Sequence, residues 1–224
     1  MQKTLNIAHR GFTREFPDNT LESFYAAIKL KIDGIECDVH ETADHHFVIF
    51  HNDKLLDKAI SELPIKEIRK VRLANYYQIP TLEETLDLCH KHIRLMLELK
   101  QISSLDLFLE VVKAKMEPSE LFITSFQTNL VRGLADFAPQ IQRGILTGHT
   151  VEEPLKLIEL TRAQIMLPMF SSATEELIHT LHSCNISVIV WDCNNASDFR
   201  ITMKWKVDGI ITDSPDILAQ ELSK

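Results

Sequence analysis

The sequence predicts an α/β protein that folds as a single-domain (β/α)₈ TIM barrel, because short apolar runs alternate with helix-like segments throughout the chain. Its 224 residues are a usual length for one such barrel. Strands that alternate with helices pair in parallel, and right-handed crossovers place the helices outside the sheet. No low-complexity tract or linker divides residues 1–224. An open doubly wound sheet is the competing fold, but no G-x-G-x-x-G motif follows the first apolar run.

The predicted strands are eight apolar runs rich in β-branched residues or leucine. A further short run stands directly behind the second of them, at 46–51. In chain order, the eight runs are residues 4–9, 33–41, 93–100, 121–126, 142–148, 163–169, 187–193 and 207–213.

Helical segments between these runs have recognisable starts. Thr81 with Glu84, and Ser172 with Glu175, match the capping box, in which a hydroxyl and a Glu three residues later satisfy each other's free backbone donors. Residues 52–80 break the alternation, because they stand between a strand and a helix without forming such a pair. We expect a small excursion over the barrel mouth there. Its apolar and cationic residues would serve packing and a solvated face or, as an alternative, a lid or a lipid contact.

Charge and cysteine content narrow the function classes. The formal net charge of −8 excludes broad, non-specific binding to nucleic acid or to an acidic membrane surface, because such binding depends on a basic face. No apolar run has the length of a transmembrane segment, and the first residues lack a signal-peptide pattern, so we expect a cytoplasmic protein. The cysteines are not spaced like zinc-binding or redox pairs and are expected to be reduced and buried. They are Cys37, Cys89, Cys184 and Cys193.

Charged residues near the ends of two predicted strands indicate a functional site. Successive side chains on a strand point to opposite faces, so Glu36 and Asp38 share one face, and Glu98 and Lys100 repeat this spacing. We expect the acids to face the barrel interior, at the strand ends that form the active face of this fold. Three converging carboxylates repel one another unless a cation is present. Oxygen-only ligands favour a hard cation such as Mg²⁺ or Ca²⁺.

Two histidines and two cationic residues are expected near these acids. His9 and His51 end two different strands, and imidazole is the usual proton carrier near neutral pH. Arg10 and Lys100 bring positive charge to the same mouth. An anion held by a metal and two cations, between two groups that give and take a proton, predicts cleavage of a phosphoester.

The order and spacing of these motifs resemble those of the glycerophosphodiester phosphodiesterase family over nearly the whole chain. The first motifs are HRG at 9–11, PDNT at 17–20, GIECDV at 34–39, TAD at 42–44, VIFH at 48–51 and ELK at 98–100. Further matches are IPTLEETL at 79–86, Trp191 with Asn194, and VDGIITDSPD at 207–216.

The resemblance implies a TIM barrel that hydrolyses glycerophosphodiesters to sn-glycerol 3-phosphate and an alcohol in glycerophospholipid breakdown. It also implies a bound Mg²⁺ or Ca²⁺, with Mn²⁺ as a further candidate. Either water or a neighbouring hydroxyl of the substrate attacks phosphorus first, and the sequence leaves both routes open. Carried onto this chain, the resemblance assigns Glu36, Asp38 and Glu98 to metal binding, His9 and His51 to acid–base catalysis, and Arg10, Lys100 and Trp191 to substrate binding.

Four positions depart from the family's motifs. Asp18 stands in place of Glu and is assigned to supporting structure. His45 replaces Gly, so the turn there must accept a side chain. Asn52 replaces the Asp after the second histidine, which removes a charge beside His51. His40 stands where the family often has Gln, and it is expected to cap the strand rather than to add a nitrogen near the metal.

Less specific explanations exist for the same residues. Interior salt bridges to Arg10 and Lys100 would explain the three acids, bonds to the backbone would explain the histidines, and packing at the rim would explain Trp191. Two other functions compete with the leading one. The first is a lysophospholipase D that acts on lipids with an acyl chain, and the second is a binding barrel that has lost turnover, which only Asn52 supports. The oligomeric state does not follow from the sequence.

Overall fold

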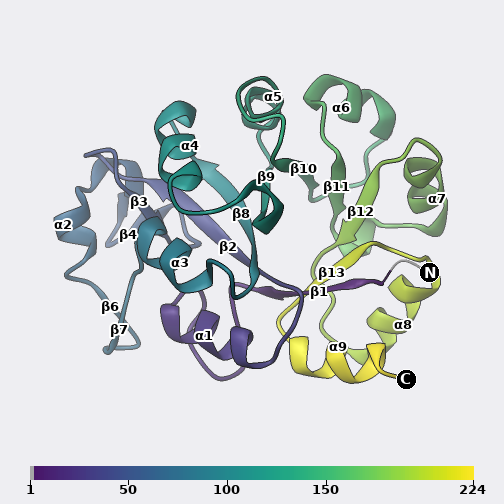
Figure 1. Cartoon of the computed structure of the whole chain (residues 1–224), viewed down its shortest axis with the longest axis horizontal. Coiled ribbons are helices and arrows are strands. Elements are labelled where there is room, and N and C mark those ends of the chain that lie inside the picture. The colour runs from purple at the N-terminus through teal and green to yellow at the C-terminus, as the bar shows by residue number, and fades with distance from the viewer. Residues whose placement is uncertain (1–2) are drawn as a thin grey trace.

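Eight parallel strands close into a barrel in the computed structural model, which describes residues 3–224 (Figure 1). They are β1 (Leu5–His9), β2 (Gly34–Glu41), β8 (Arg94–Gln101), β9 (Leu121–Ser125), β10 (Gln142–Thr147), β11 (Ile165–Pro168), β12 (Ser187–Val190) and β13 (Gly209–Thr212). Each strand pairs in parallel with the next in this order, and β13 pairs with β1 to close the ring. The predicted fold class is confirmed.

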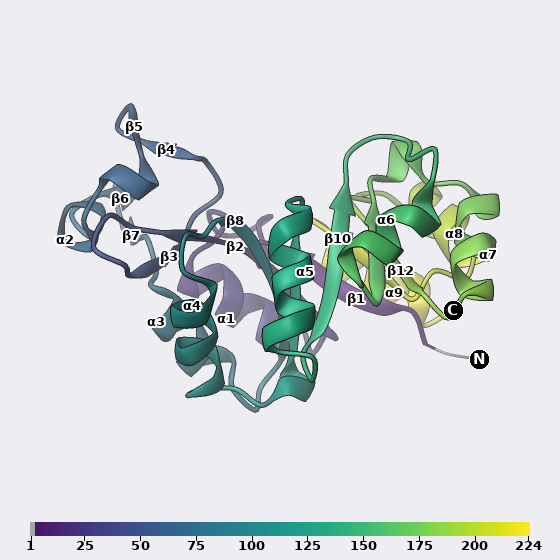
Figure 2. The same cartoon turned by 90° about the horizontal axis from the view of Figure 1, so that it is seen from above.

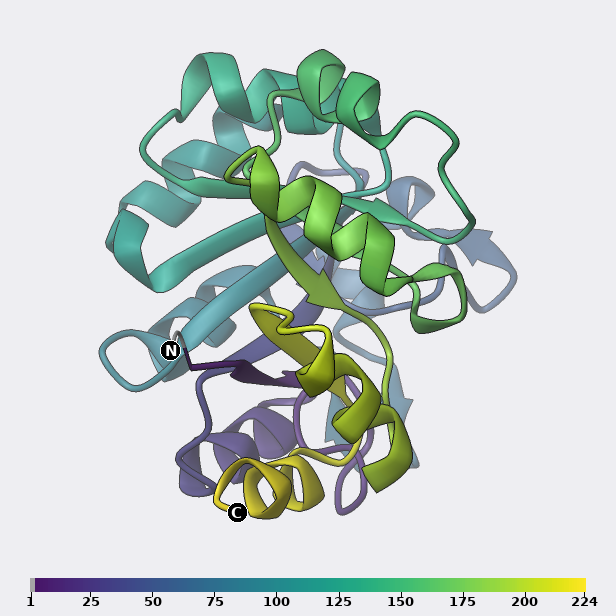
Figure 3. The ribbon, with the colours of Figure 1, turned by 90° about the vertical axis from the view of Figure 1, so that its right-hand side faces the viewer.

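Eight helices follow the barrel strands and cover the outside of the barrel. They are α1 (Leu21–Lys29), α3 (Leu82–Cys89), α4 (Leu105–Lys113), α5 (Thr128–Phe137), α6 (Pro154–Thr161), α7 (Glu175–Ser183), α8 (Ala196–Lys204) and α9 (Pro215–Leu222). Figures 1 and 3 show α9 beside α1, so the last helix completes the outer layer next to the first. Within residues 3–224, no helix is both long enough and apolar enough to cross a membrane.

The two predicted capping boxes have different outcomes. At α3 the prediction is confirmed, because the backbone N–H of Glu84 donates to Thr81 Oγ1 (3.1 Å) and the backbone N–H of Thr81 donates to Glu84 Oε2 (2.9 Å). At α7 it is wrong, because the helix begins at Glu175 and its cap is Thr174. Ser172 belongs to a preceding 3₁₀ turn, where its hydroxyl bonds to the backbone and is not free to cap α7.

Side chains of the strands alternate between two apolar layers, as their period of two requires. Outward-facing residues such as Ile35 and Val39 are fully buried between the barrel and its helices. Inward-facing residues such as Ile7 and Met96 fill the barrel interior. On the inward side of β2 and β8, Glu36 lies opposite Met96 and Asp38 lies opposite Glu98, so the acidic residues begin where the apolar interior ends.

All four cysteines are free, and three of them are buried as predicted: Cys37, Cys89 and Cys193. The expectation was wrong for Cys184, which is exposed because it directly follows the last turn of α7 on the outer surface.

The excursion at 52–80 forms a small compact unit at one end of the molecule (Figure 2). A short strand before it, β3 (Phe47–Ile49), pairs antiparallel with β2. Leu55, Ile60 and Ile68 are buried in a small apolar core that the excursion shares with Val48 of β3. Its elements are the hairpin β4 (Lys54–Leu55) and β5 (Lys58–Ala59), a 3₁₀ turn (Ile60–Glu62), α2 (Ile65–Ile68), and the hairpin β6 (Arg72–Leu73) and β7 (Tyr77–Gln78).

Candidate active site

Three acidic side chains converge on the inward side of β2 and β8. One carboxylate oxygen from each of Glu36, Asp38 and Glu98 lies within 4.8 Å of the others, and all three residues are buried. The register places Asp38 directly opposite Glu98. Asn19 Nδ2 donates to Asp38 Oδ2 at 2.8 Å and fixes the orientation of that carboxylate. The structure thus brings together the three residues predicted as metal ligands.

Two cationic side chains reach the same cluster. Lys100 Nζ lies 3.0 Å from Asp38 Oδ1 and 2.6 Å from Glu98 Oε1. Arg10 Nε lies 3.2 Å from Asp38 Oδ2. The interior salt bridges considered as an alternative are therefore present for two of the acids. Glu36 has no such cation beside it: its nearest polar contacts among the described residues are the backbone N–H of Arg10 (3.3 Å) and His9 Nε2 (4.0 Å).

The charges of the cluster do not balance. Burial and the neighbouring Asp38 raise the pKa of Glu36 to about 8. Burial and the charge of Asp38 raise the pKa of Glu98, although Lys100 and Arg10 lower it. Burial alone would raise the pKa of Asp38 as well, but Lys100 and Arg10 outweigh burial and hold that pKa below its ordinary value. A hard divalent cation would supply the missing positive charge, and carboxylate oxygens this close together fit Mg²⁺ or Ca²⁺.

The loop after β1 brings Arg10 onto the cluster through an unusual backbone. Arg10 has a φ of 59° and Gly11 a φ of 88°, both in the left-handed region. A Cβ on Gly11 would collide with the Ser23 side chain, so only glycine fits there. Ser23 Oγ in turn donates to the backbone carbonyl of Arg10 at 3.0 Å. The glycine of the HRG motif is therefore required by the turn that aims the arginine.

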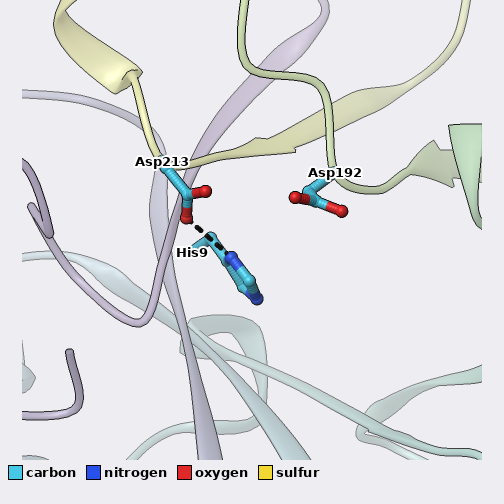
Figure 4. Close-up of side chains that lie close together, drawn as sticks. All are labelled: His9, Asp192 and Asp213. Carbon is cyan, nitrogen blue, oxygen red and sulfur yellow. Dashed lines mark hydrogen bonds and ion pairs between the residues drawn. The ribbon is translucent and has the colours of Figure 1, made fainter.

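His9 is held by a chain of hydrogen bonds at the mouth. Its Nδ1 lies 2.8 Å from Asp213 Oδ1, as Figure 4 shows, and Asn194 Nδ2 donates to the other oxygen of Asp213 at 2.8 Å. Burial lowers the pKa of His9, but the bond to Asp213 and the charge of Glu36 outweigh it, so the pKa is raised. The bond at Nδ1 leaves Nε2 as the ring nitrogen that faces the carboxylate cluster.

His51 has a different, uncharged partner. It lies just beyond β3, and its Nδ1 is 3.0 Å from Asn52 Oδ1, so the departure from Asp still leaves an acceptor for the ring. Burial lowers the pKa of His51 more than the charge of Asp38 raises it. His40 is the last residue but one of β2, and its Nε2 is 3.5 Å from the carbonyl oxygen of His51. His40 therefore supports the segment that carries His51 and does not reach the carboxylate cluster.

The turn at His45 accepts a side chain in the way the sequence requires. His45 has a φ of 60°, and its Nδ1 lies 2.7 Å from Glu41 Oε1. Asp18 lies 3.5 Å from Arg10 Nη1, at the edge of the site. Both departures from the family's motifs are thus accommodated without displacing the acidic cluster.

A cavity of about 200 Å³ is lined by all the predicted site residues except Asp38, which lies behind it against Arg10 and Lys100. Trp191 forms part of its wall, where Nε1 donates to the carbonyl oxygen of Leu167 (2.8 Å) and the ring meets Phe126 edge-on at a centroid distance of 5.7 Å. A larger cavity of about 800 Å³, around His182, lies near the N-terminal ends of β12 and β13 and contains no predicted site residue. The smaller cavity is lined by His9, Arg10, Glu36, His51, Met96, Glu98, Lys100, Thr124, Phe126, Leu146, Trp191 and Ile211.

Sequence reasoning did not identify the residues that hold His9 in place, namely Asp213, which bonds to its ring, and Asn194, which bonds to Asp213. Asp213 and Asn194 fall within motifs that had been matched, but neither was given a role at the site. Asp213 directly follows β13, so its place after a predicted strand was a signal available in the sequence. Asp192 was missed as well: its carboxylate lies near His9 and Asp213 and accepts a hydrogen bond from Asn194 Nδ2 at 3.0 Å (Figure 4).

Known proteins are similar to this chain in sequence and in fold. The glycerophosphodiester phosphodiesterase of Caldanaerobacter subterraneus subsp. tengcongensis is 28% identical, across 99% of this chain and 99% of its own. A glycerophosphodiester phosphodiesterase structure from Parabacteroides distasonis has a TM-score of 0.89 at 25% identity and covers 99% of this chain and 98% of its own. An Oleispira antarctica phosphodiesterase, solved with the product sn-glycerol-3-phosphate, has a TM-score of 0.91 at 23% identity and covers 97% of this chain and 96% of its own.

The family assignment depends on a match that spans most of the chain. The sequence profile of the Glycerophosphoryl diester phosphodiesterase family matches residues 9–217, from His9 at the end of β1 into α9. The chain therefore belongs to the glycerophosphoryl diester phosphodiesterase family, which confirms both the resemblance and the enzyme class predicted from its sequence.

Proposed function

We propose that this enzyme hydrolyses glycerophosphodiesters to sn-glycerol 3-phosphate and an alcohol, as a step in glycerophospholipid breakdown. The observation that carries the proposal is the meeting of three buried carboxylates, two cations and two histidines. All of them except Asp38 line one cavity, and Asp38 lies within 4.8 Å of the other two carboxylates. The sn-glycerol-3-phosphate bound to the Oleispira antarctica phosphodiesterase supports the choice of product. A cytoplasmic location stays a prediction from the sequence.

We propose Glu36, Asp38 and Glu98 as the ligands of a divalent cation, Mg²⁺ or Ca²⁺, with Mn²⁺ as a further candidate. The raised pKa of Glu36, about 8, supports this assignment, because a group this buried keeps its charge at neutral pH only beside a cation. A bound ion would polarise a phosphoryl oxygen and stabilise the negative charge that develops during the reaction.

Arg10 and Lys100 are proposed to hold the phosphate. Both are anchored on Asp38, at 3.2 Å and 3.0 Å, which orders their long side chains before substrate binds. Charged donors fixed in this way bind an anion without a further loss of side-chain freedom.

The two histidines are proposed to divide the proton transfers. An anionic partner stabilises a charged ring, so His9, bonded to Asp213, is the better proton donor. The neutral amide of Asn52 gives His51 no such stabilisation, so His51 is the better base. In this scheme His51 takes the proton of the attacking water or substrate hydroxyl as its oxygen bonds to phosphorus. The bond from phosphorus to the oxygen of the leaving group breaks, and His9 gives that oxygen the proton that makes it an alcohol. If a substrate hydroxyl attacks, water then opens the cyclic phosphate that forms, which completes the hydrolysis.

An activity panel tests the proposal. Purified protein is incubated with glycerophosphocholine, glycerophosphoethanolamine or a lysophospholipid, after chelation and with Mg²⁺, Ca²⁺ or Mn²⁺ restored. We expect sn-glycerol 3-phosphate from the first two substrates, loss of activity on chelation, and loss of activity in His9→Ala and Glu36→Ala. Release of lysophosphatidate from the lysophospholipid alone would indicate the lysophospholipase D alternative. Binding without turnover of any substrate would indicate a barrel that has lost catalysis.

A further inference from the structure

Thr124 carries a buried hydroxyl that the proposed chemistry leaves unused. It lies on β9, where the parallel register places it beside Glu98 of β8. Alternation along β9 turns Thr124 to the same inward side as Phe122, while Ile123 packs against the outer helices. Only 1% of Thr124 is exposed, and its Oγ1 has no hydrogen-bond partner among the residues that the structure describes.

A buried hydroxyl without a hydrogen-bond partner lowers the stability of the fold, because no interaction offsets the loss of its contact with water. Valine has nearly the same shape and would avoid this cost. The methyl group of Thr124 already has a packing role, because Cγ2 lies 3.2 Å from the position that a Cβ on Gly144 would take. The hydroxyl itself therefore requires a partner from outside the protein, and Thr124 lies in the wall of the catalytic cavity where such a partner binds.

The surroundings of Thr124 indicate an uncharged partner. From β9 to the segment after β12, the described chain lines the cavity with Thr124, Phe126, Leu146 and Trp191, so Thr124 is the hydroxyl on a side that is otherwise apolar and aromatic, next to the acidic Glu98 of β8. The cationic groups that suit a phosphoryl anion come instead from the loop after β1 and from β8. An anion binds more strongly beside those charges, which leaves Thr124 to a neutral oxygen of the same ligand.

We propose that Thr124 Oγ1 forms a hydrogen bond with a hydroxyl of the substrate's glycerol moiety and so favours glycerol-bearing phosphodiesters. The inference depends on the proposed function, which supplies the glycerol moiety. A hydroxyl donates and accepts, which suits a partner that is itself a hydroxyl. A site built to bond a substrate hydroxyl rejects an analogue that lacks it, because the protein's own polar group is then left unpaired.

Binding measurements on two matched variants test this role. Thr124→Val removes the hydroxyl at nearly constant shape, and Thr124→Ser keeps it. Each protein, supplied with Mg²⁺, is titrated calorimetrically with sn-glycerol 3-phosphate, propyl phosphate and inorganic phosphate. We expect Thr124→Val to lower the affinity for sn-glycerol 3-phosphate about tenfold and to change the affinities for propyl phosphate and inorganic phosphate by less than about twofold. Thr124→Ser should keep most of the affinity for sn-glycerol 3-phosphate.

Thermal melting of the variants separates this role from a folding defect. Because Oγ1 is unpaired in the free protein, Thr124→Val should melt at or above the wild-type temperature. Unchanged affinity for sn-glycerol 3-phosphate in Thr124→Val would overturn the proposal. An equal loss of affinity for all three ligands would also overturn the proposal, because Thr124 would then act on the phosphate or on the ion. Failure of the proposed function has a different signature, namely wild-type protein that does not hydrolyse glycerophosphocholine.

Discussion

The two sides of the catalytic cavity differ in composition and in their support. The side built from β1, β2 and β8 is charged, and its groups are fixed by ion pairs and hydrogen bonds such as Lys100–Asp38 and Asn19–Asp38. The side built from β9 to β12 is apolar and aromatic, with Thr124 as its hydroxyl. A charged side supplies reactivity, whereas an apolar side supplies shape. Substitutions on the first should therefore act mainly on kcat, and those on the second mainly on binding.

The largest effect is expected for Glu36→Gln, because it removes the carboxylate of the cluster that, among the described residues, has no Lys or Arg side chain beside it. We expect kcat to fall about a thousandfold or more, and calorimetry to show weaker binding of Mg²⁺ or Ca²⁺. Glu41→Gln is a control on the same strand, because Glu41 bonds to His45 and Ser103 away from the cluster. Comparable loss of activity in both variants would contradict a specific role for Glu36.

A loss of about 10²- to 10⁴-fold in kcat is expected for His51→Ala, because it removes a proton carrier without touching the acids. Affinity for the divalent ion should stay within about twofold of the wild-type value, since His51 pairs with Asn52 and not with a carboxylate of the cluster. Steady-state kinetics and ion titration measure the two quantities. A large loss of ion affinity would place His51 among the ligands instead.

A smaller loss, about 10- to 100-fold in kcat, is expected for Asp213→Asn, because it weakens the group that orients His9. Asp192→Asn is the matched control, since Asp192 bonds to Asn194 and makes no hydrogen bond to His9 among the described residues. We expect the control to stay within about threefold of wild type. The pH–rate profile of Asp213→Asn should also shift, because the charge that stabilises protonated His9 is lost. Equal effects of the two substitutions would contradict the prediction that Asp213 positions His9.

On the apolar side, Trp191→Phe should raise KM about fivefold with little change in kcat. The substitution keeps an aromatic wall but loses the hydrogen bond from Nε1 to Leu167 O that fixes the ring. Steady-state kinetics on glycerophosphocholine check the prediction. A fall in kcat larger than the rise in KM would show that this side also takes part in the chemistry, and the contrast between the two sides would fail.

The smallest effect is a pH dependence of stability in protein stripped of metal. Burial and Asp38 raise the pKa of Glu36 to about 8, so the folded state keeps a proton that the unfolded chain loses near its ordinary pKa. This contribution to stability is full below the unfolded pKa and is lost as pH rises towards 8. We expect the melting temperature of chelated protein to fall by about 5 °C between pH 5 and pH 8. In Glu36→Gln, scanning calorimetry should show a smaller dependence.

The fold and the charged side were largely predictable from sequence, because both depend on short-range periodicity. A spacing of two residues turned Glu36 and Asp38 to one face, and a repeat of that spacing brought in Glu98. The pairing of His9 with Asp213 lies beyond such reasoning, because 204 positions separate them and only closure of the barrel brings them together. The start of α7 was missed for a local reason, since two hydroxyl residues compete for the cap there and backbone geometry decides between them.

The two ends of the excursion lie next to each other in space. The backbone N–H of Ile49 donates to Pro80 O at 2.9 Å, and Val48 forms a β-bridge with Thr81. Because the two junctions are joined, changes in the length of the excursion would leave the barrel strands in place. Among the described residues, none of the excursion lines the catalytic cavity, so the reactive groups would also keep their positions.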